Sequence, residues 1–216
     1  SHMYVSREAA RALGKPVEAL KIITCHLGNG CSVAAVNAGV SVDTSMGFTP
    51  LEGLVMGSRS GDLDPYVPLY LMERERMGIP EMSDFLNKRS GLVGICGKKD
   101  MRDILEDAER GERPALLAVE VFTYRVAKYI GAYAMAMNGV DAIVFTAGMG
   151  ERSAAIRSRI LSYASFLGLD LDEERNARGE MILSTPGSRV AALMIHTDEE
   201  LVIARDTHRL ITARAR

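Results

Sequence analysis

Two tight turns close together in the chain constrain its fold more than any other feature. The turns, Gly28-Asn29-Gly30 and Asn37-Ala38-Gly39, separate three short runs rich in β-branched residues. These runs cover Lys21 to His26, Ser32 to Asn37 and Val40 to Thr44. Asn-Gly and similar glycine turns between such runs are typical of hairpins. Two hairpins in succession predict a meander of three antiparallel strands.

The rest of the chain predicts helices interrupted by two more strands. Residues 140–146 form a strongly apolar run, which predicts a strand buried on both faces, and residues 190–195 predict another strand. Residues 91–97 predict an apolar loop or short strand, and 147–151 predict a glycine turn. Ser6 is the expected N-cap of the first helix, which Gly14-Lys15-Pro16 would break or kink. The expected helices cover 6–20, 65–77, 80–89, 100–110, 114–138, 153–166, 172–178 and 198–211.

This order, βββαβαβα, predicts an α/β fold built on a mixed sheet. The meander would be followed by parallel strands with crossover helices on the faces. The order is similar to the ribonuclease H-like core of actin-type ATPases and sugar kinases. Residues 65–113 would then be a helical insertion in the domain 21–216, and residues 1–20 would form an N-terminal helix outside it.

Composition excludes several classes of function. Apolar residues make up 47% and charged residues 25% of the 216, as in an ordinary soluble protein. The net charge of −2 gives no support for binding nucleic acid or an anionic membrane. Cys25, Cys31 and Cys96 show no metal-binding spacing, and no segment is typical of a signal peptide or a membrane span. We therefore expect reduced thiols and a cytoplasmic protein.

Two glycine-containing segments each have a structural and a functional interpretation. The run from His26 to Gly30 could be only a good hairpin turn, or its backbone N–H groups could form an anion site. It is not a Walker loop, because no Gly-Lys-Ser/Thr follows. The run from Ala147 to Ser153 could be a plain strand-to-helix turn or a nucleotide-binding turn. A dinucleotide fingerprint, with Asp170 as the ribose acid, fits poorly because Ser153 replaces the third glycine.

Charged residues on loops and helix starts are the next candidates. Arg59 lies among Gly57, Ser58, Ser60 and Gly61, where its guanidinium would be accessible to a carboxylate or phosphoryl group or would simply be solvated. Asp100 and Arg102 could only open a helix, with Asp100 as its N-cap.

A carboxylate-rich helix start follows the last strand. Thr197 and Glu200 fit a capping box, which leaves Asp198 and Glu199 either to interact with the helix dipole or to hold Mg²⁺. His26, His196 and His208 have no metal spacing and no nucleophile elbow, so we expect neither a zinc site nor a catalytic triad.

Four long motifs together resemble a known family. HLGNG, SVDTSMGFTPLEGLVMGSRSGDLDP, FTAGMGERSAAIR and TDEELVIARDT occur in this order. They resemble the acetate kinase family, of which propionate and butyrate kinases are close relatives, from Ser6 or earlier to near the end of the chain. The resemblance implies reversible phosphoryl transfer from ATP to acetate, giving acetyl phosphate and ADP, with Mg²⁺ as cofactor.

The resemblance also implies roles for particular residues. The nucleotide would be bound by His26, Gly28, Asn29, Gly30, Asp100, Arg102, Gly148, Gly150, Glu151 and Arg152. Arg59 would be catalytic and would hold the acyl carboxylate and the transferring phosphoryl group, and Pro50 would touch the acyl chain. Glu199 would support Mg²⁺. Arg152 stands where the family usually has Asn, so the adenosine contact and the nucleotide preference could differ here.

The resemblance further implies that the chain lacks half of the enzyme. The family folds as two similar actin-type halves, and the first half supplies an aspartate, an arginine and a histidine of the active site. Residues 1–6 fit either native family sequence or the remnant of a removed tag. We expect weak nucleotide binding, negligible turnover and, as in the family, a homodimer formed through this domain.

Three other functions remain as alternatives. The chain could be a non-catalytic dimerisation module with a vestigial nucleotide site, for which Arg152 is the supporting feature. It could belong to a propionate or butyrate kinase. A dinucleotide-dependent oxidoreductase would need a GxGxxG after the first strand, which this sequence lacks.

Overall fold

The computed structural model describes residues 1–197, 200, 203–204, 207 and 210–212, which contain a five-stranded mixed sheet in the order β3-β2-β1-β4-β5. The strands are β1 (Lys21–Leu27), β2 (Cys31–Asn37), β3 (Val40–Thr44), β4 (Ala142–Thr146) and β5 (Ala191–Met194). The pairs β1–β2 and β2–β3 are antiparallel, whereas β1–β4 and β4–β5 are parallel. The predicted meander and the predicted parallel strands are therefore confirmed.

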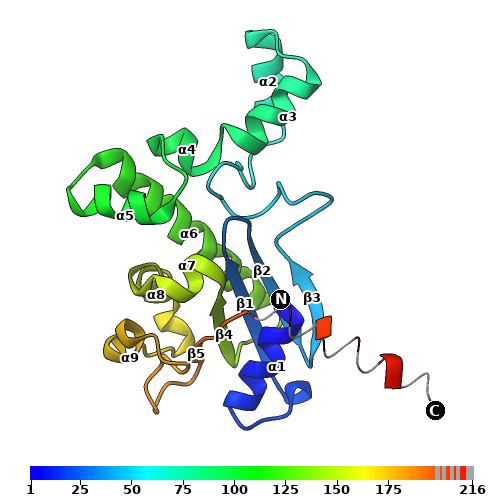
Figure 1. Ribbon diagram of the computed structural model, residues 1–216, viewed down its shortest axis with the longest axis vertical. Coiled ribbons are helices and arrows are strands. Elements are labelled where there is room, and N and C mark those ends of the chain that lie inside the picture. The colour runs from blue at the N-terminus through cyan, green and yellow to red at the C-terminus, as the bar shows by residue number, and fades with distance from the viewer. Residues whose placement is uncertain (198–199, 201–202, 205–206, 208–209, 213–216) are drawn as a thin grey trace.

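Helices cover both faces of the sheet, and most of the insertion extends away from it (Figure 1). The described helices are α1 (His2–Ala12), α2 (Tyr66–Glu75), α3 (Ile79–Lys88), α4 (Gly91–Cys96), α5 (Met101–Glu109), α6 (Arg113–Ala136), α7 (Ala147–Arg152), α8 (Ala154–Leu161) and α9 (Glu173–Arg178). Two 3₁₀ segments, Val17–Ala19 and Ser162–Leu167, are present as well.

Side-chain alternation along the strands divides the core into two clusters. On one face Ile22 and Val144 pack with Val5 and Ala9 of α1. On the other face alternate residues of the same strands pack under α5, α6 and α8, with Phe122 fully buried at the centre. All of β4 is buried, as its apolar run predicts. Two covered faces fix the register of the central strands, because a slip of one residue would move each side chain to the opposite cluster.

The first helix begins earlier than expected. It starts at His2, and Ser6 is not its N-cap but a buried residue inside the helix, whose Oγ donates to the Met3 carbonyl at 3.0 Å. Ser6 lies beside Val5 on the face that packs on the sheet, and burial there outweighs its capping preference. The helix ends at Ala12, before the expected Gly14-Lys15-Pro16 break.

Two segments expected to lack helix are in fact helical. Residues 91–96 form α4, because the amide N–H groups of Leu92 and Val93 donate to the carbonyls of Met56 and Gly57, each at 2.9 Å. These loop carbonyls pair N–H groups that a helix start leaves free. Residues 147–152 form α7, so the glycine turn expected over 147–151 is wrong. Within this segment only Ala147 has a positive φ, of +64°.

The helix expected over 153–166 ends at Leu161 and continues as a 3₁₀ segment. The helix expected over 198–211 lies largely outside the described residues, of which 200, 203–204, 207 and 210–212 are helical. No helix in the described part of the chain has the length and apolarity needed to cross a membrane.

Candidate functional site

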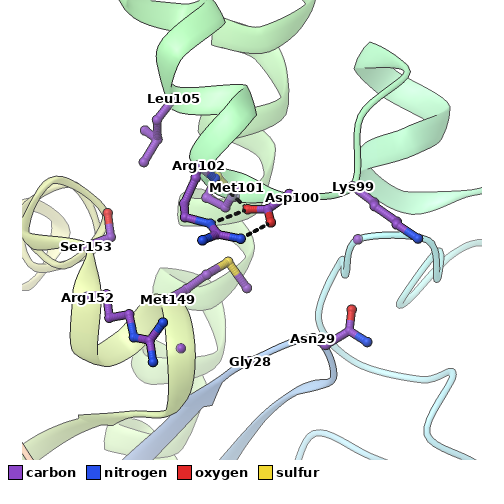
Figure 2. Close-up of a pocket in the computed structure, with 12 residues that line it drawn as sticks. Gly28, Asn29, Lys99, Asp100, Met101, Arg102, Leu105, Met149, Arg152 and Ser153 are labelled. Carbon is purple, nitrogen blue, oxygen red and sulfur yellow. Dashed lines mark hydrogen bonds and ion pairs between the residues drawn. The ribbon is translucent and has the colours of Figure 1, made fainter.

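A pocket of about 450 Å³ opens where the parallel strands β1 and β4 end. Four segments far apart in sequence surround it: the turn after β1, the loop at Gly57, the start of α5, and α7 with its following residue (Figure 2). This position, at the carboxyl ends of neighbouring parallel strands, is the usual one for ligands of α/β folds. Its lining residues are Gly28, Asn29, Gly57, Lys99, Asp100, Met101, Arg102, Leu105, Gly148, Met149, Arg152 and Ser153.

The structure brings together six of the ten predicted nucleotide-binding residues. These six, which line the pocket, are Gly28, Asn29, Asp100, Arg102, Gly148 and Arg152. The other four, His26, Gly30, Gly150 and Glu151, do not line it. Which of them contact a ligand stays a prediction. Geometry nevertheless separates residues that face the pocket from residues that lie behind it.

Asp100 and Arg102 form a closed pair at the edge of the pocket. Asp100 is the N-cap of α5, as expected, and its Oδ1 accepts the Arg102 amide at 3.0 Å. The Arg102 side chain also donates to both carboxylate oxygens, at 3.1 and 2.6 Å. These hydrogen bonds lower the pKa of Asp100 to about 2 and raise the pKa of Arg102. The pair therefore stays ionised and adds no net charge to the pocket.

Two other cations give the pocket its charge. Lys99 and Arg152 are both exposed, and neither forms an ion pair with any residue that the structure describes. With Arg102 balanced by Asp100, these two leave a surplus of two positive charges among the lining side chains. Met101, Leu105 and Met149 supply apolar surface beside them (Figure 2). A ligand with a flat apolar group and several negative charges matches this combination.

The Gly28-Asn29-Gly30 turn lies between this pocket and Arg59. The Gly28 amide donates to the Gly30 carbonyl at 3.2 Å, and the Cys31 thiol donates to the Gly28 carbonyl at 3.1 Å. A Cβ on Gly28 would lie only 3.4 Å from Cβ of Ala147, so the turn closely approaches the start of α7. On the other side, a Cβ on Gly30 would lie 3.6 Å from Nη1 of Arg59.

Arg59 and Pro50, which were predicted to bind the acyl substrate, lie together but outside the pocket. Nη1 of Arg59 contacts the Pro50 carbonyl at 3.4 Å and Sδ of Met56 at 3.6 Å, both long contacts. Among the described residues Arg59 has no carboxylate partner. Its guanidinium therefore keeps most of its donors for a ligand.

His26 lies at the end of β1, where its ring centroid is 6.1 Å from that of His2. His2 Nδ1 contacts Thr24 Oγ1 at 2.7 Å, and Nε2 contacts Ser32 Oγ at 2.8 Å. Burial, together with the nearby His26, lowers the pKa of His2 to about 4. His2 is therefore neutral near pH 7 and serves as a polar link between α1 and the sheet.

The predicted magnesium ligand, Glu199, lies outside the described residues. No group of three potential metal ligands occurs in the described part of the chain. The amide of Thr197, which the expected capping box would pair with Glu200, donates to Glu151 Oε1 at 3.2 Å instead.

Sequence reasoning missed several residues that shape the site. Lys99 adds charge to the pocket, and its place directly before Asp100 could have suggested it. Asp62 accepts hydrogen bonds from Arg125 and Tyr129 of α6 and from the Gly53 amide, which anchors the loop that carries Arg59. No local pattern in the sequence relates residue 62 to residues 125 and 129.

The Acetokinase family model matches residues 1–205 of the chain. The chain belongs to the acetokinase family. It is 59% identical over 217 residues to the acetate kinase of Thermotoga maritima, an alignment that covers 98% of the chain and 54% of that protein. The chain thus spans about half the length of the curated relatives it matches and corresponds to their C-terminal half.

Solved structures of the family agree with the fold. The crystal structure of Porphyromonas gingivalis acetate kinase matches with a TM-score of 0.94 and 42% identity, over 98% of this chain and 54% of that one. A propionate kinase from Francisella tularensis matches with a TM-score of 0.89 and 45% identity, over 94% and 52%. The predicted actin-type α/β fold with its mixed sheet is confirmed.

Proposed function

We propose that this chain is the nucleotide-binding half of an ATP-dependent acetate kinase. One arrangement carries the proposal: the Gly28-Asn29-Gly30 turn separates a cationic pocket from Arg59. A nucleotide in the pocket would present its phosphates at this turn, beside the guanidinium. The names of the relatives, acetate kinases and a propionate kinase, support the same reaction class.

In the proposed reaction an acetate oxygen forms a bond to the γ-phosphorus of ATP, the bond to the bridging β-phosphate oxygen breaks, and ADP leaves. Such transfer depends mainly on positioning and on neutralising charge. Arg59 holds the acetate carboxylate and the transferring phosphoryl group in its planar fork, and Pro50 lies against the acyl chain. Backbone N–H groups of the glycine turn receive the phosphates. Mg²⁺, for which Glu199 is the predicted ligand, supplies further charge neutralisation when bound.

The chain alone provides one wall of this site. We expect it to bind Mg-ADP weakly and to turn over negligibly. Calorimetry should show heat on titration with Mg-ADP, and a hydroxamate assay with ATP and acetate should show no acyl phosphate above background. Formation of acyl phosphate at a rate typical of whole acetate kinases would contradict the proposed incompleteness. Absence of any heat of binding would instead favour the alternative of a dimerisation module with a vestigial site.

A hybrid protein tests the reaction itself. The half of the Thermotoga maritima acetate kinase that this chain does not match, joined to residues 1–216, should form acetyl phosphate. Arg59→Ala should abolish the activity of the hybrid. Arg159→Ala, at an exposed arginine of α8 far from Arg59 in sequence, is the matched control and should retain it. Equal activity in both variants would contradict the role of Arg59.

The substrate could instead be propionate, because one relative of known structure is a propionate kinase. Comparing acetate, propionate and butyrate in the hybrid would decide between them. We also propose that two copies associate through this domain, as in the family. Light scattering after size-exclusion chromatography should give the mass of a dimer.

A further inference from the structure

Helix α7 carries one wall of the pocket, but it has little means of holding itself in place. It is six residues long, and two of them, Gly148 and Gly150, are glycines. Glycine has low helix propensity, and a helix this short is unstable without outside contacts. Its position beside the glycine turn must therefore come from its surroundings.

Glu151 fixes the beginning of α7 from behind the pocket. Its Oε1 accepts the Ala147 amide at 2.8 Å and the Thr197 amide at 3.2 Å, and its Oε2 contacts Nδ1 of His196 at 2.7 Å. Burial opposes ionisation of Glu151, but these hydrogen bonds outweigh it and lower the pKa of the carboxyl group. Of these hydrogen bonds, the one from the Ala147 amide matters most for the position of α7, because Ala147 has a φ of +64°, which is strained for a residue with a side chain.

Arg157 fixes the other end of α7. Its Nη1 donates to the carbonyls of Gly150 and Glu151, at 2.9 and 2.8 Å. Its Nε and Nη2 donate to Oδ1 and the carbonyl of Asn176, at 2.7 and 2.8 Å, so α7 is tied to α9. The Asn176 amide group then donates to the Ala154 carbonyl and to Ser158 Oγ of α8. The guanidinium joins three helices through one rigid plane.

The surroundings of Arg157 are unusual for a cation. The residue is 1% exposed, and its hydrogen-bond acceptors are all neutral oxygens, with no carboxylate among the described residues. Burial accordingly lowers its pKa. A well-packed apolar side chain would avoid this desolvation. Geometry compensates for the desolvation of Arg157, because only a guanidinium donates to several carbonyls from a fixed plane.

We propose that Glu151 and Arg157 are positioning residues for the nucleotide pocket, which hold α7 from its two ends without touching the ligand. The role rests on the proposed nucleotide-binding function. It reassigns Glu151, which the family resemblance places at the adenosine, to the support behind the pocket wall. Residues of α7 that do face the pocket are Gly148, Met149 and Arg152 (Figure 2).

Two conservative variants test the proposal in the whole chain. Glu151→Gln keeps shape but weakens the acceptor, and Arg157→Lys keeps charge but loses the fork. Each should raise the Kd for Mg-ADP about tenfold, which corresponds to about 1.4 kcal/mol. Without nucleotide, each should also speed amide hydrogen exchange across residues 147–152, while β1 and β4 stay protected. Glu174→Gln and Arg159→Met, at exposed positions of neighbouring helices, are the controls and should change neither quantity.

Two results would overturn the proposal. Wild-type affinity in both folded variants would show that α7 needs neither residue. Weaker binding with unchanged exchange in the ligand-free protein would make Glu151 a ligand contact rather than a support. If the wild-type chain binds no Mg-ADP, the proposed function fails, but the exchange data still decide whether these residues hold α7.

Discussion

Replacing Asp62 with asparagine should loosen the loop that carries Arg59. The Asp62 carboxylate is only about one third exposed and accepts three hydrogen bonds. Oδ1 accepts the Gly53 amide at 2.8 Å, and Oδ2 accepts Nη1 of Arg125 at 2.9 Å and the Tyr129 hydroxyl at 2.6 Å. Burial and this hydrogen bond to Asp62 raise the pKa of Tyr129, so its hydroxyl remains a donor.

The size of the effect follows from which bonds the substituted side chain can keep. The asparagine carbonyl would still accept the Gly53 amide, but the asparagine NH₂ group would face two donors. Hydrogen bonds to a charged group contribute about 1.5–3 kcal/mol each, and partial exposure favours the lower end. Asp62→Asn should therefore destabilise the fold by about 3 kcal/mol. Tyr129→Phe should cost about 1.5 kcal/mol, and the double variant should cost no more than Asp62→Asn alone.

Urea denaturation followed by circular dichroism measures these differences by linear extrapolation. The double-mutant cycle should give a coupling energy of about 1.5 kcal/mol between Asp62 and Tyr129. Tyr124→Phe, an exposed tyrosine on the same helix, is the control and should change stability by less than about 0.5 kcal/mol. The reasoning would be refuted if the two single-variant changes in unfolding free energy added up in the double variant, or if Asp62→Asn lowered that free energy by less than about 1 kcal/mol.

Three further changes have expected outcomes. Because burial lowers the pKa of His2 to about 4, the unfolded chain binds the extra proton first as pH falls. The contribution of His2 to the free energy of unfolding should thus be fully present above about pH 6.5 and fall by roughly 3 kcal/mol toward pH 4. Urea titrations at several pH values should show that His2→Gln removes this dependence. Arg152→Asn should raise the Kd for Mg-ADP about three- to tenfold and reduce its salt dependence, as measured by calorimetry; tighter binding would show that Arg152 obstructs the nucleotide instead. Gly61→Ala should destabilise by about 3 kcal/mol or more, because a Cβ there would lie 2.6 Å from the Gly53 carbonyl oxygen; Gly97→Ala, also at positive φ but in open space, should cost about 1 kcal/mol.

The sequence predicts the sheet well because its signals are local. β-branched runs and glycine turns specify β1, β2 and β3 within a residue of their observed bounds. The two segments that were expected to lack helix have non-local causes. Residues 91–96 become helical because carbonyls of residues 56 and 57 receive their first amides. Residues 147–152 form a helix whose first amide donates to Glu151 and whose Gly150 carbonyl accepts from Arg157, which lies outside the segment. Neither contact leaves a periodic pattern in the segment itself.

The sequence predicted which segments reach the pocket, but it did not predict which of their side chains point into it. The family resemblance selected six residues that line the pocket. Gly28, Asn29, Gly148 and Arg152 lie in motifs that follow β1 and β4, and Asp100 and Arg102 lie at the start of α5. The resemblance also selected Glu151, whose carboxylate points toward Ala147 and Thr197 rather than into the pocket. A one-residue difference in a helix turns a side chain by about 100°, which motif spacing alone does not resolve.

The arginines show most clearly what the structure adds, because the sequence presents them as equivalent cations. Arg157 donates to four neutral oxygens and is buried, so it has nothing left for a ligand. Arg102 is balanced by Asp100, and Arg125 is paired with Asp62. Arg59 makes only two long contacts, and Arg152 makes none with the described residues. Of these five arginines, Arg59 and Arg152 keep unused donors among the described residues, and they flank the Gly28-Asn29-Gly30 turn from opposite sides, one beside Gly30 and one in the pocket with Gly28. Ligand binding should therefore depend on Arg59 and Arg152 through charge, and on Arg157 only through the shape of α7.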